Sequence, residues 1–108
     1  MDKVVQAELN KLKGLITNTM PVEQIYLFGS YAHGTPCKDS DIDLYVILKD
    51  DNPMRDIDAA IKIRQAICDQ QTFPIDLLVM KKHQYLQRKA APTLERKVAR
   101  EGILLYGA

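Results

Sequence analysis

Hydrophobic residues recur along the first half of the chain in two patterns, one typical of a helix and one typical of strands. Around residues 3–18 they fall on one face of an amphipathic helix, at Val5, Leu9, Leu12 and Ile16. The apolar run Ile25–Phe28 predicts a first strand. A tight turn with a short helix over residues 29–34 and a loop over residues 35–39 should follow it. The apolar segment that ends at Leu48 predicts a second strand.

The second half of the chain predicts three more helices and two more strands. Asn52 is a candidate N-cap with Pro53 at the first helical position, so a long helix should run from there to about Gln70. The remaining predicted elements are a strand at Ile75–Met80, helices at Lys82–Arg88 and Thr93–Arg100, a helix cap at Gly102 and a closing strand at Ile103–Tyr106. This alternation predicts an α+β fold in which about four strands form a mixed sheet with helices mainly on one face. The other face would then be free to hold a site.

Length and composition restrict the possible classes of protein. A chain of 108 residues, 46% apolar and 27% charged, is expected to form a single globular domain over residues 1–108. No apolar run approaches the roughly 20 residues that span a bilayer, and the charged start of the chain does not resemble a signal peptide. We therefore predict a cytoplasmic protein with no membrane partner, in which Cys37 and Cys68 are free thiols.

Charge is distributed unevenly although the net charge is only +1. Residues 38–58 contain seven acidic and three basic residues, whereas residues 81–100 contain seven basic residues and one acid, Glu95. The basic segment is either a solvated helix face or a contact surface for phosphate, RNA or an acidic protein. A nucleic-acid partner is not expected, because Tyr85 is the only aromatic residue available there for base stacking.

Two aspartates separated by one residue carry the clearest chemical signal. In a strand, Asp41 and Asp43 would lie on one face, close to the turn at Gly29 and Ser30, where the backbone can approach an anion. Two carboxylates about 4 Å apart repel by about 4 kcal/mol at an effective dielectric of about 20, and a divalent cation removes this repulsion. Oxygen ligands favour Mg²⁺, or Mn²⁺, over zinc. The alternative is that both aspartates are solvent-exposed residues of an edge strand.

A third acid, Asp76, interrupts the apolar run of the next predicted strand. A buried strand rarely tolerates a lone carboxylate without a partner, and the predicted partner is the same metal. A structural aspartate that caps a turn is the alternative explanation.

The order of these motifs resembles a known signature. The chain reads Gly29-Ser30-x-Ala32-x-Gly34 and then Ser40-Asp41-x-Asp43-Leu44. This is similar to the DNA polymerase β-like nucleotidyltransferase superfamily, and more narrowly to the minimal nucleotidyltransferases, or MNT domains, which are the antitoxin halves of HEPN/MNT pairs. The resemblance covers most of the chain. One position departs from it, because His33 stands where these relatives often have arginine.

The resemblance implies a fold, a reaction and a partner. The fold would be the nucleotidyltransferase fold with an αβαβαβ core. The reaction would be the transfer of a nucleoside monophosphate, AMP from ATP, to a hydroxyl group, by which the protein acts as an antitoxin. It would use two Mg²⁺ ions, with Mn²⁺ as a substitute. The implied catalytic and metal-binding residues are Asp41, Asp43 and Asp76, and the implied nucleotide-binding residues are Gly29, Ser30, Ser40 and His33. The donor would be ATP or another NTP, and the acceptor a tyrosine of a partner HEPN toxin. Two alternatives are a non-catalytic antitoxin that neutralises its partner by binding and a stand-alone transferase that acts on a small molecule.

Overall fold

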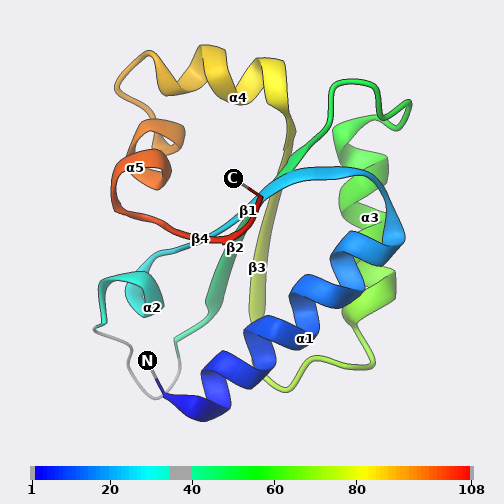
Figure 1. Ribbon diagram of the computed structural model, residues 1–108, viewed down its shortest axis with the longest axis vertical. Helices are drawn as coiled ribbons and strands as arrows, with labels where there is room; N and C mark the ends of the chain where they lie inside the picture. The colour runs from blue at the N-terminus through cyan, green and yellow to red at the C-terminus, as the bar shows by residue number, and fades with distance from the viewer. Residues whose placement is uncertain (1, 35–39, 108) are drawn as a thin grey trace.

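The computed structural model describes residues 2–34 and 40–107, and within them four strands form one mixed sheet (Figure 1). The elements in chain order are α1 (Lys3–Thr19), β1 (Val22–Phe28), α2 (Ser30–His33), β2 (Ile42–Leu48), α3 (Asp56–Ile67), β3 (Ile75–Lys81), α4 (Lys82–Lys89), α5 (Leu94–Glu101) and β4 (Ile103–Tyr106). The strand order is β3-β2-β1-β4. β1 runs antiparallel to both β2 and β4, whereas β2 and β3 are parallel. The predicted α+β fold with a mixed sheet is therefore confirmed.

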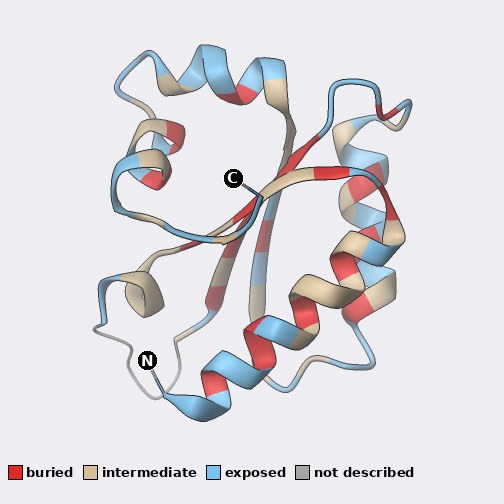
Figure 2. Ribbon diagram, viewed as in Figure 1, coloured by how far each residue is buried: buried red, intermediate tan, exposed pale blue. Residues whose placement is uncertain are grey.

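The larger core lies between the sheet and the two longest helices, α1 and α3. In β2, alternate side chains beginning with Ile42 and Leu44 point into this core, as the two-residue period of a strand requires. The predicted apolar face of α1 supplies the other wall, and Figure 2 shows buried positions recurring along this helix. α1 and α3 thus cover one face of the sheet, as the sequence led us to expect.

Glu8 is an acid on this buried face of α1. It is only 4% exposed, yet its carboxylate accepts hydrogen bonds from the backbone N–H and the hydroxyl of Thr72, at 2.7 and 2.8 Å, and pairs with Lys11 at 2.9 Å. Burial acts to raise the pKa of Glu8, but these partners outweigh it and the pKa lies below its usual value. Glu8 therefore ties α1 to the loop that precedes β3.

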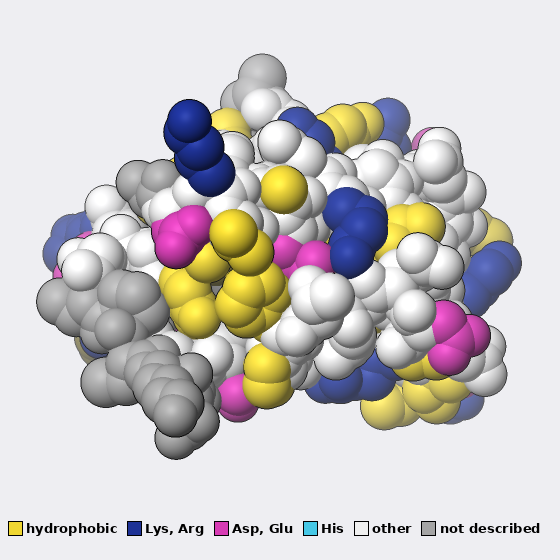
Figure 3. Space-filling model, turned by 90° about the horizontal axis from the view of Figure 1, so that it is seen from below, with side chains coloured by type: hydrophobic (Ala, Val, Ile, Leu, Met, Phe, Trp, Pro, Cys, Tyr) yellow, Lys and Arg dark blue, Asp and Glu magenta, His cyan; other side chains and the backbone are white. Residues whose placement is uncertain are grey.

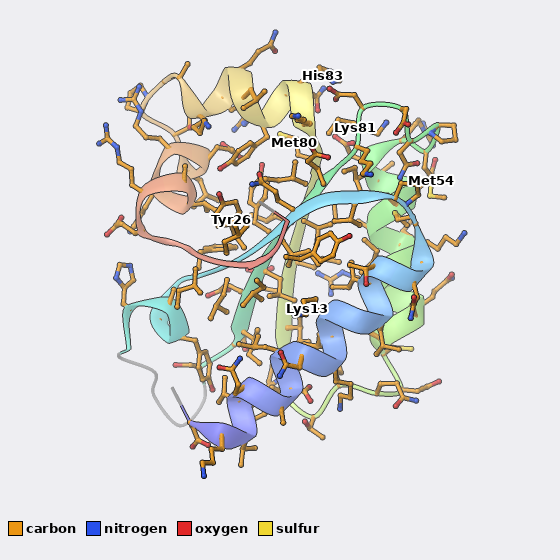
Figure 4. The ribbon with its side chains drawn as sticks, in the orientation of Figure 1. Lys13, Tyr26, Met54, Met80, Lys81 and His83 are labelled. Carbon is orange, nitrogen blue, oxygen red and sulfur yellow. The ribbon has the colours of Figure 1, made fainter. Side chains whose placement is uncertain are left out.

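A second, smaller core lies on the opposite face of the sheet, under α4 and α5. Tyr45 and Ile47 of β2 pack there against Tyr85 of α4 and Val98 of α5. In Figure 4, Tyr26 and Met80 lie between the sheet and these two helices. This face is therefore partly covered and not free, because the side chains of the central strand are apolar on both sides.

The start of α3 corrects one detail of the sequence interpretation. Asn52 is not its N-cap: the helix begins at Asp56, and Arg55 occupies the cap position. The side chain of Asn52 instead accepts a hydrogen bond from the Met54 N–H at 3.0 Å and donates to the Pro21 carbonyl at 3.4 Å. The short-range hydrogen bonds that make asparagine a good helix cap can also stabilise a turn, and in this fold Asn52 stabilises a turn.

The helix cap at Gly102 is confirmed, since its N–H donates to the Val98 carbonyl at 2.9 Å. Cys68 is exposed and free, as expected, while Cys37 lies outside the described residues. No helix in the described part of the chain is long and apolar enough to cross a membrane.

Candidate active site

Two of the three predicted acids lie side by side on neighbouring strands. Asp43 is the second residue of β2, and its register partner on the parallel strand β3 is Asp76. Register partners in a sheet point to the same face, and adjacent strands are about 4.8 Å apart. Asp41 directly precedes β2 and is exposed. Because Asp43 alternates with Tyr45, the acids lie on the face that α4 and α5 only partly cover.

The charges of these acids act on one another. Burial raises the pKa of Asp43, and the neighbouring carboxylates of Asp76 and then Asp41 raise it further. The expectation that Asp76 sits in a buried strand is wrong, because β3 is a sheet edge and Asp76 is exposed. Asp76 therefore does not need a positively charged partner because of burial. The need arises because its carboxylate lies close to the carboxylate of Asp43.

The donor set suits a hard divalent cation, since all three side chains offer carboxylate oxygens. Within residues 2–34 and 40–107, however, no group of three His, Cys, Asp or Glu side chains is arranged to hold a metal ion as it stands. The acids are carried by adjacent elements, and their side chains would have to reorient before their oxygens could meet on one ion.

Gly29 lies against the Asp43 carboxylate. Its backbone has φ 76° and ψ −155°, a conformation that is essentially restricted to glycine. A Cβ built on Gly29 would lie 2.1 Å from Asp43 Oδ2, well inside any permitted contact. The sequence assigned Gly29 to the approach of a phosphate, and the structure adds a second requirement: only glycine leaves room for this carboxylate.

The turn after Gly29 forms the single-turn helix α2. The N–H groups of Ala32 and His33 both donate to the Gly29 carbonyl at 3.1 Å, so these two amides are already used within the turn. Ser30 is half-buried at the first position of α2. The helix ends at Gly34, which takes the left-handed conformation.

The other two predicted nucleotide-binding residues lie on either side of this region. The His33 ring nitrogen Nε2 is 3.8 Å from Glu101 Oε1, so the imidazole is directed toward α5. Ser40 is half-buried immediately before Asp41. The loop over residues 35–39, which was predicted between them, lies outside the described residues.

A pocket of about 230 Å³ adjoins Gly29. It is lined by Phe28, Gly29 and His33 on one side and by Leu94, Lys97, Val98, Glu101 and Gly102 on the other. We refer to it as the α2–α5 pocket. Sequence reasoning missed the part played by α5, although the spacing of Leu94, Lys97, Val98 and Glu101 is that of one helix face.

A buried polar network holds α5 and α4 over the sheet. The Tyr45 hydroxyl donates to Glu95 Oε2 at 2.8 Å, and Arg88 Nε donates to Glu95 Oε1 at 2.9 Å. Burial opposes ionisation of Glu95, which is 3% exposed, but the hydrogen bonds from Tyr45 and Arg88 outweigh it and lower the pKa. The pKa of Tyr45 is raised by burial and by its bond to Glu95. α5 is thereby fixed in position as one wall of the pocket.

The polar residues at the far end of the sheet do not contribute to the site. His83 lies at the start of α4 (Figure 4), where its Nδ1 is 2.8 Å from Asp50 Oδ1. Asp50 follows the end of β2, whereas Asp43 lies near its beginning. This pair therefore belongs to the opposite end of the strand.

Comparison with known proteins assigns the family. Residues 10–108 match the family model described as polymerase beta, nucleotidyltransferase. The chain belongs to that family. It is accordingly a nucleotidyltransferase, and the predicted membership of the polymerase β-like nucleotidyltransferases is confirmed.

Individual relatives of this nucleotidyltransferase agree with the assignment. It is 31% identical over 103 residues to the protein adenylyltransferase MntA of Shewanella oneidensis, covering 94% of this chain and 67% of that protein. It is also similar to a crystal structure described as a toxin–antitoxin with AMP-PNP, with a TM-score of 0.65, 27% identity, and coverage of 93% of this chain and 73% of that one. A putative nucleotidyltransferase from Sulfolobus solfataricus shares the fold, with a TM-score of 0.60 at 18% identity over 99% of this chain and 90% of its own.

Proposed function

We propose that this nucleotidyltransferase transfers AMP from ATP to a tyrosine hydroxyl of a partner HEPN toxin, in a Mg²⁺-dependent reaction, and so acts as an antitoxin. The observation that carries the proposal is the placement of Asp43 beside Asp76, with Gly29 in contact with the Asp43 carboxylate. Similarity to a protein adenylyltransferase and to a toxin–antitoxin with AMP-PNP supports the donor and the kind of partner. We propose that residues 1–108 act as one domain.

The proposed site residues divide the work. Asp41, Asp43 and Asp76 would hold two Mg²⁺ ions, and Mn²⁺ could replace them. The bound ions would offset the negative charge of the acids and of the phosphates. The triphosphate would lie against the turn at Gly29 and Ser30.

Ser40 and His33 would flank the triphosphate on either side of this turn. Asp76 is exposed and can take the proton from the acceptor hydroxyl. The acceptor oxygen then bonds to the α-phosphorus, the bond to the β-phosphate oxygen breaks, and pyrophosphate leaves.

The acceptor would approach the end of the molecule at which α2 and the start of α1 lie. Figure 3 shows this end, where a group of hydrophobic side chains lies beside acidic ones, with lysine and arginine side chains around them. Part of the basic segment is already used within the fold: Lys82 pairs with Glu23 at 3.0 Å and Arg88 with Glu95. A docking surface for an acidic partner would therefore depend on the exposed basic residues of α5, such as Lys97 and Arg100.

The test is co-expression with a HEPN protein encoded by an adjacent reading frame, followed by intact-mass measurement of that protein, the candidate toxin. We expect a mass increase of one or more AMP units with the wild type and none with the double variant Asp41→Asn, Asp43→Asn. Asp51→Asn is the matched control, since Asp51 is an exposed acid beyond the other end of β2. Full neutralisation of an unmodified toxin by the double variant would refute transfer and favour an antitoxin that acts by binding alone.

Separate substitutions distinguish the roles of the acids. Asp43→Asn should remove both Mg²⁺-dependent ATP binding and transfer, whereas Asp76→Asn should retain much of the binding and lose transfer. Equal loss of binding in the two variants, measured by calorimetry, would overturn this division of roles.

A further inference from the structure

The α2–α5 pocket directly adjoins the proposed phosphate and metal site. Phe28 forms part of its wall, and Phe28 is also the register partner of Asp43 across the antiparallel pair of β1 and β2. Such partners point to the same face with their Cβ atoms about 5 Å apart. Gly29 belongs to both sites, since it lines the pocket and touches the Asp43 carboxylate. The pocket therefore begins where the proposed triphosphate site ends.

The size and lining of the pocket suit one flat ring system. Its floor is apolar, formed by Phe28, Leu94 and Val98. Leu94 is 41% exposed, which leaves apolar surface open to a ligand. A volume of about 230 Å³ lies below the roughly 300–1,000 Å³ of pockets that enclose a drug-sized ligand. The space can thus take a heterocyclic base, while the sugar and the phosphates remain outside it.

Charged groups at the rim give the pocket a chemical preference. Lys97 and Glu101 lie on the same face of α5 as the apolar floor. A carboxylate only accepts hydrogen bonds, so Glu101 can accept from the exocyclic amino group of a base such as adenine and would repel a carbonyl at the same edge. The Glu101 Oε1 atom is 3.8 Å from His33 Nε2, so this carboxylate lies beside α2 at the edge of the pocket.

We propose that the α2–α5 pocket binds the nucleobase of the donor nucleotide, with Leu94 as an apolar contact and Glu101 selecting a base that carries an exocyclic amino group. The inference rests on the proposed function, because it requires the triphosphate to lie at Gly29. When the triphosphate of a nucleotide lies at Gly29, its base extends away from the phosphates. The α2–α5 pocket offers the base an apolar surface next to this glycine.

The test compares three ligands by isothermal titration calorimetry in the presence of Mg²⁺: ATP, ITP and inorganic tripolyphosphate. ITP has a carbonyl where ATP has the amino group, and tripolyphosphate has no base. We expect the wild type to bind ATP more tightly than either. Leu94→Ala should weaken ATP binding by about tenfold, equivalent to about 1.4 kcal/mol, because it removes apolar contact with the base. It should leave tripolyphosphate binding unchanged, because tripolyphosphate has no base.

The second variant, Glu101→Ala, should retain binding but lose the several-fold preference for ATP over ITP. Leu86→Ala is the matched control, since Leu86 is 45% exposed on α4 and is not part of the pocket. Thermal unfolding of each variant verifies that it is folded.

The outcomes separate this inference from the proposed function. If the wild type binds ATP no more tightly than tripolyphosphate, or if Leu94→Ala and Leu86→Ala behave alike, the nucleobase assignment is overturned while the phosphate site stands. If neither ATP nor tripolyphosphate binds to the wild type, the proposed function fails and the nucleobase assignment fails with it.

Discussion

Replacing Gly29 by alanine should abolish nucleotide binding and leave the protein folded. The glycine-only conformation at Gly29, φ 76° and ψ −155°, costs alanine about 1–3 kcal/mol. The added Cβ would lie 2.1 Å from Asp43 Oδ2, so the carboxylate must move away from its place beside Asp76. Since domains of this size are stable by about 5–15 kcal/mol, the strain alone should not unfold the variant.

Gly34→Ala is the matched control for this substitution. Gly34 also has φ 76°, but no atom of residues 2–34 and 40–107 is found within 4 Å of the position its Cβ would take. Alanine in the left-handed region costs about 1–2 kcal/mol, so urea denaturation should show a loss of stability in both variants. The increase in melting temperature caused by ATP and Mg²⁺ should survive in Gly34→Ala and disappear in Gly29→Ala.

A double-mutant cycle isolates the contact itself. Asp43→Ala removes the carboxylate with which the new Cβ overlaps, so Gly29→Ala should cost less in that background than in the wild type. Additive free energies of unfolding would show that no such contact exists. An unchanged thermal shift with ATP and Mg²⁺ in Gly29→Ala would refute the proposed link between this glycine and the position of the acid.

Three further predictions concern stability. Tyr45→Phe removes one of the hydrogen-bond donors to the buried Glu95 carboxylate. Urea denaturation should show that it lowers the free energy of unfolding by about 1–3 kcal/mol. No change would mean that this hydrogen bond contributes nothing to stability. Gly14→Ala should raise that free energy by about 0.5–1 kcal/mol, because Gly14 lies within α1 and its Cβ would meet no atom of the described part of the chain within 4 Å. A loss of stability would contradict the open space there. The lowered pKa of Glu8 stabilises the fold above the ordinary value of 4.5, and this contribution is lost as the pH falls through the lower folded pKa. Glu8→Gln should therefore flatten the decline in stability below about pH 4.5, and an unchanged acid profile would rule out this role of the hydrogen bonds from Thr72.

The sequence identified most elements of the fold because their patterns are local. The amphipathic face of α1, the apolar strand β2 and the glycine that ends α5 each have a signal within a few residues. It misplaced the start of α3, where the side chain of Asn52 was free to cap either a helix or a turn. In the fold the Asn52 side chain also donates to the Pro21 carbonyl, a partner that the local sequence does not reveal.

For the site, the sequence by itself determined the chemical groups and their order along the chain. The spacing of Asp41 and Asp43 and the glycine before Ser30 can be read directly, since they depend on residues only one or two positions apart. Only the tertiary structure decided that Asp76 pairs with Asp43, because the register of two strands is set by packing and hydrogen bonds across more than 30 residues of chain. The same holds for α5, whose pocket face lies beside Phe28 and Gly29 because Glu95, Tyr45 and Arg88 fix the helix over the sheet.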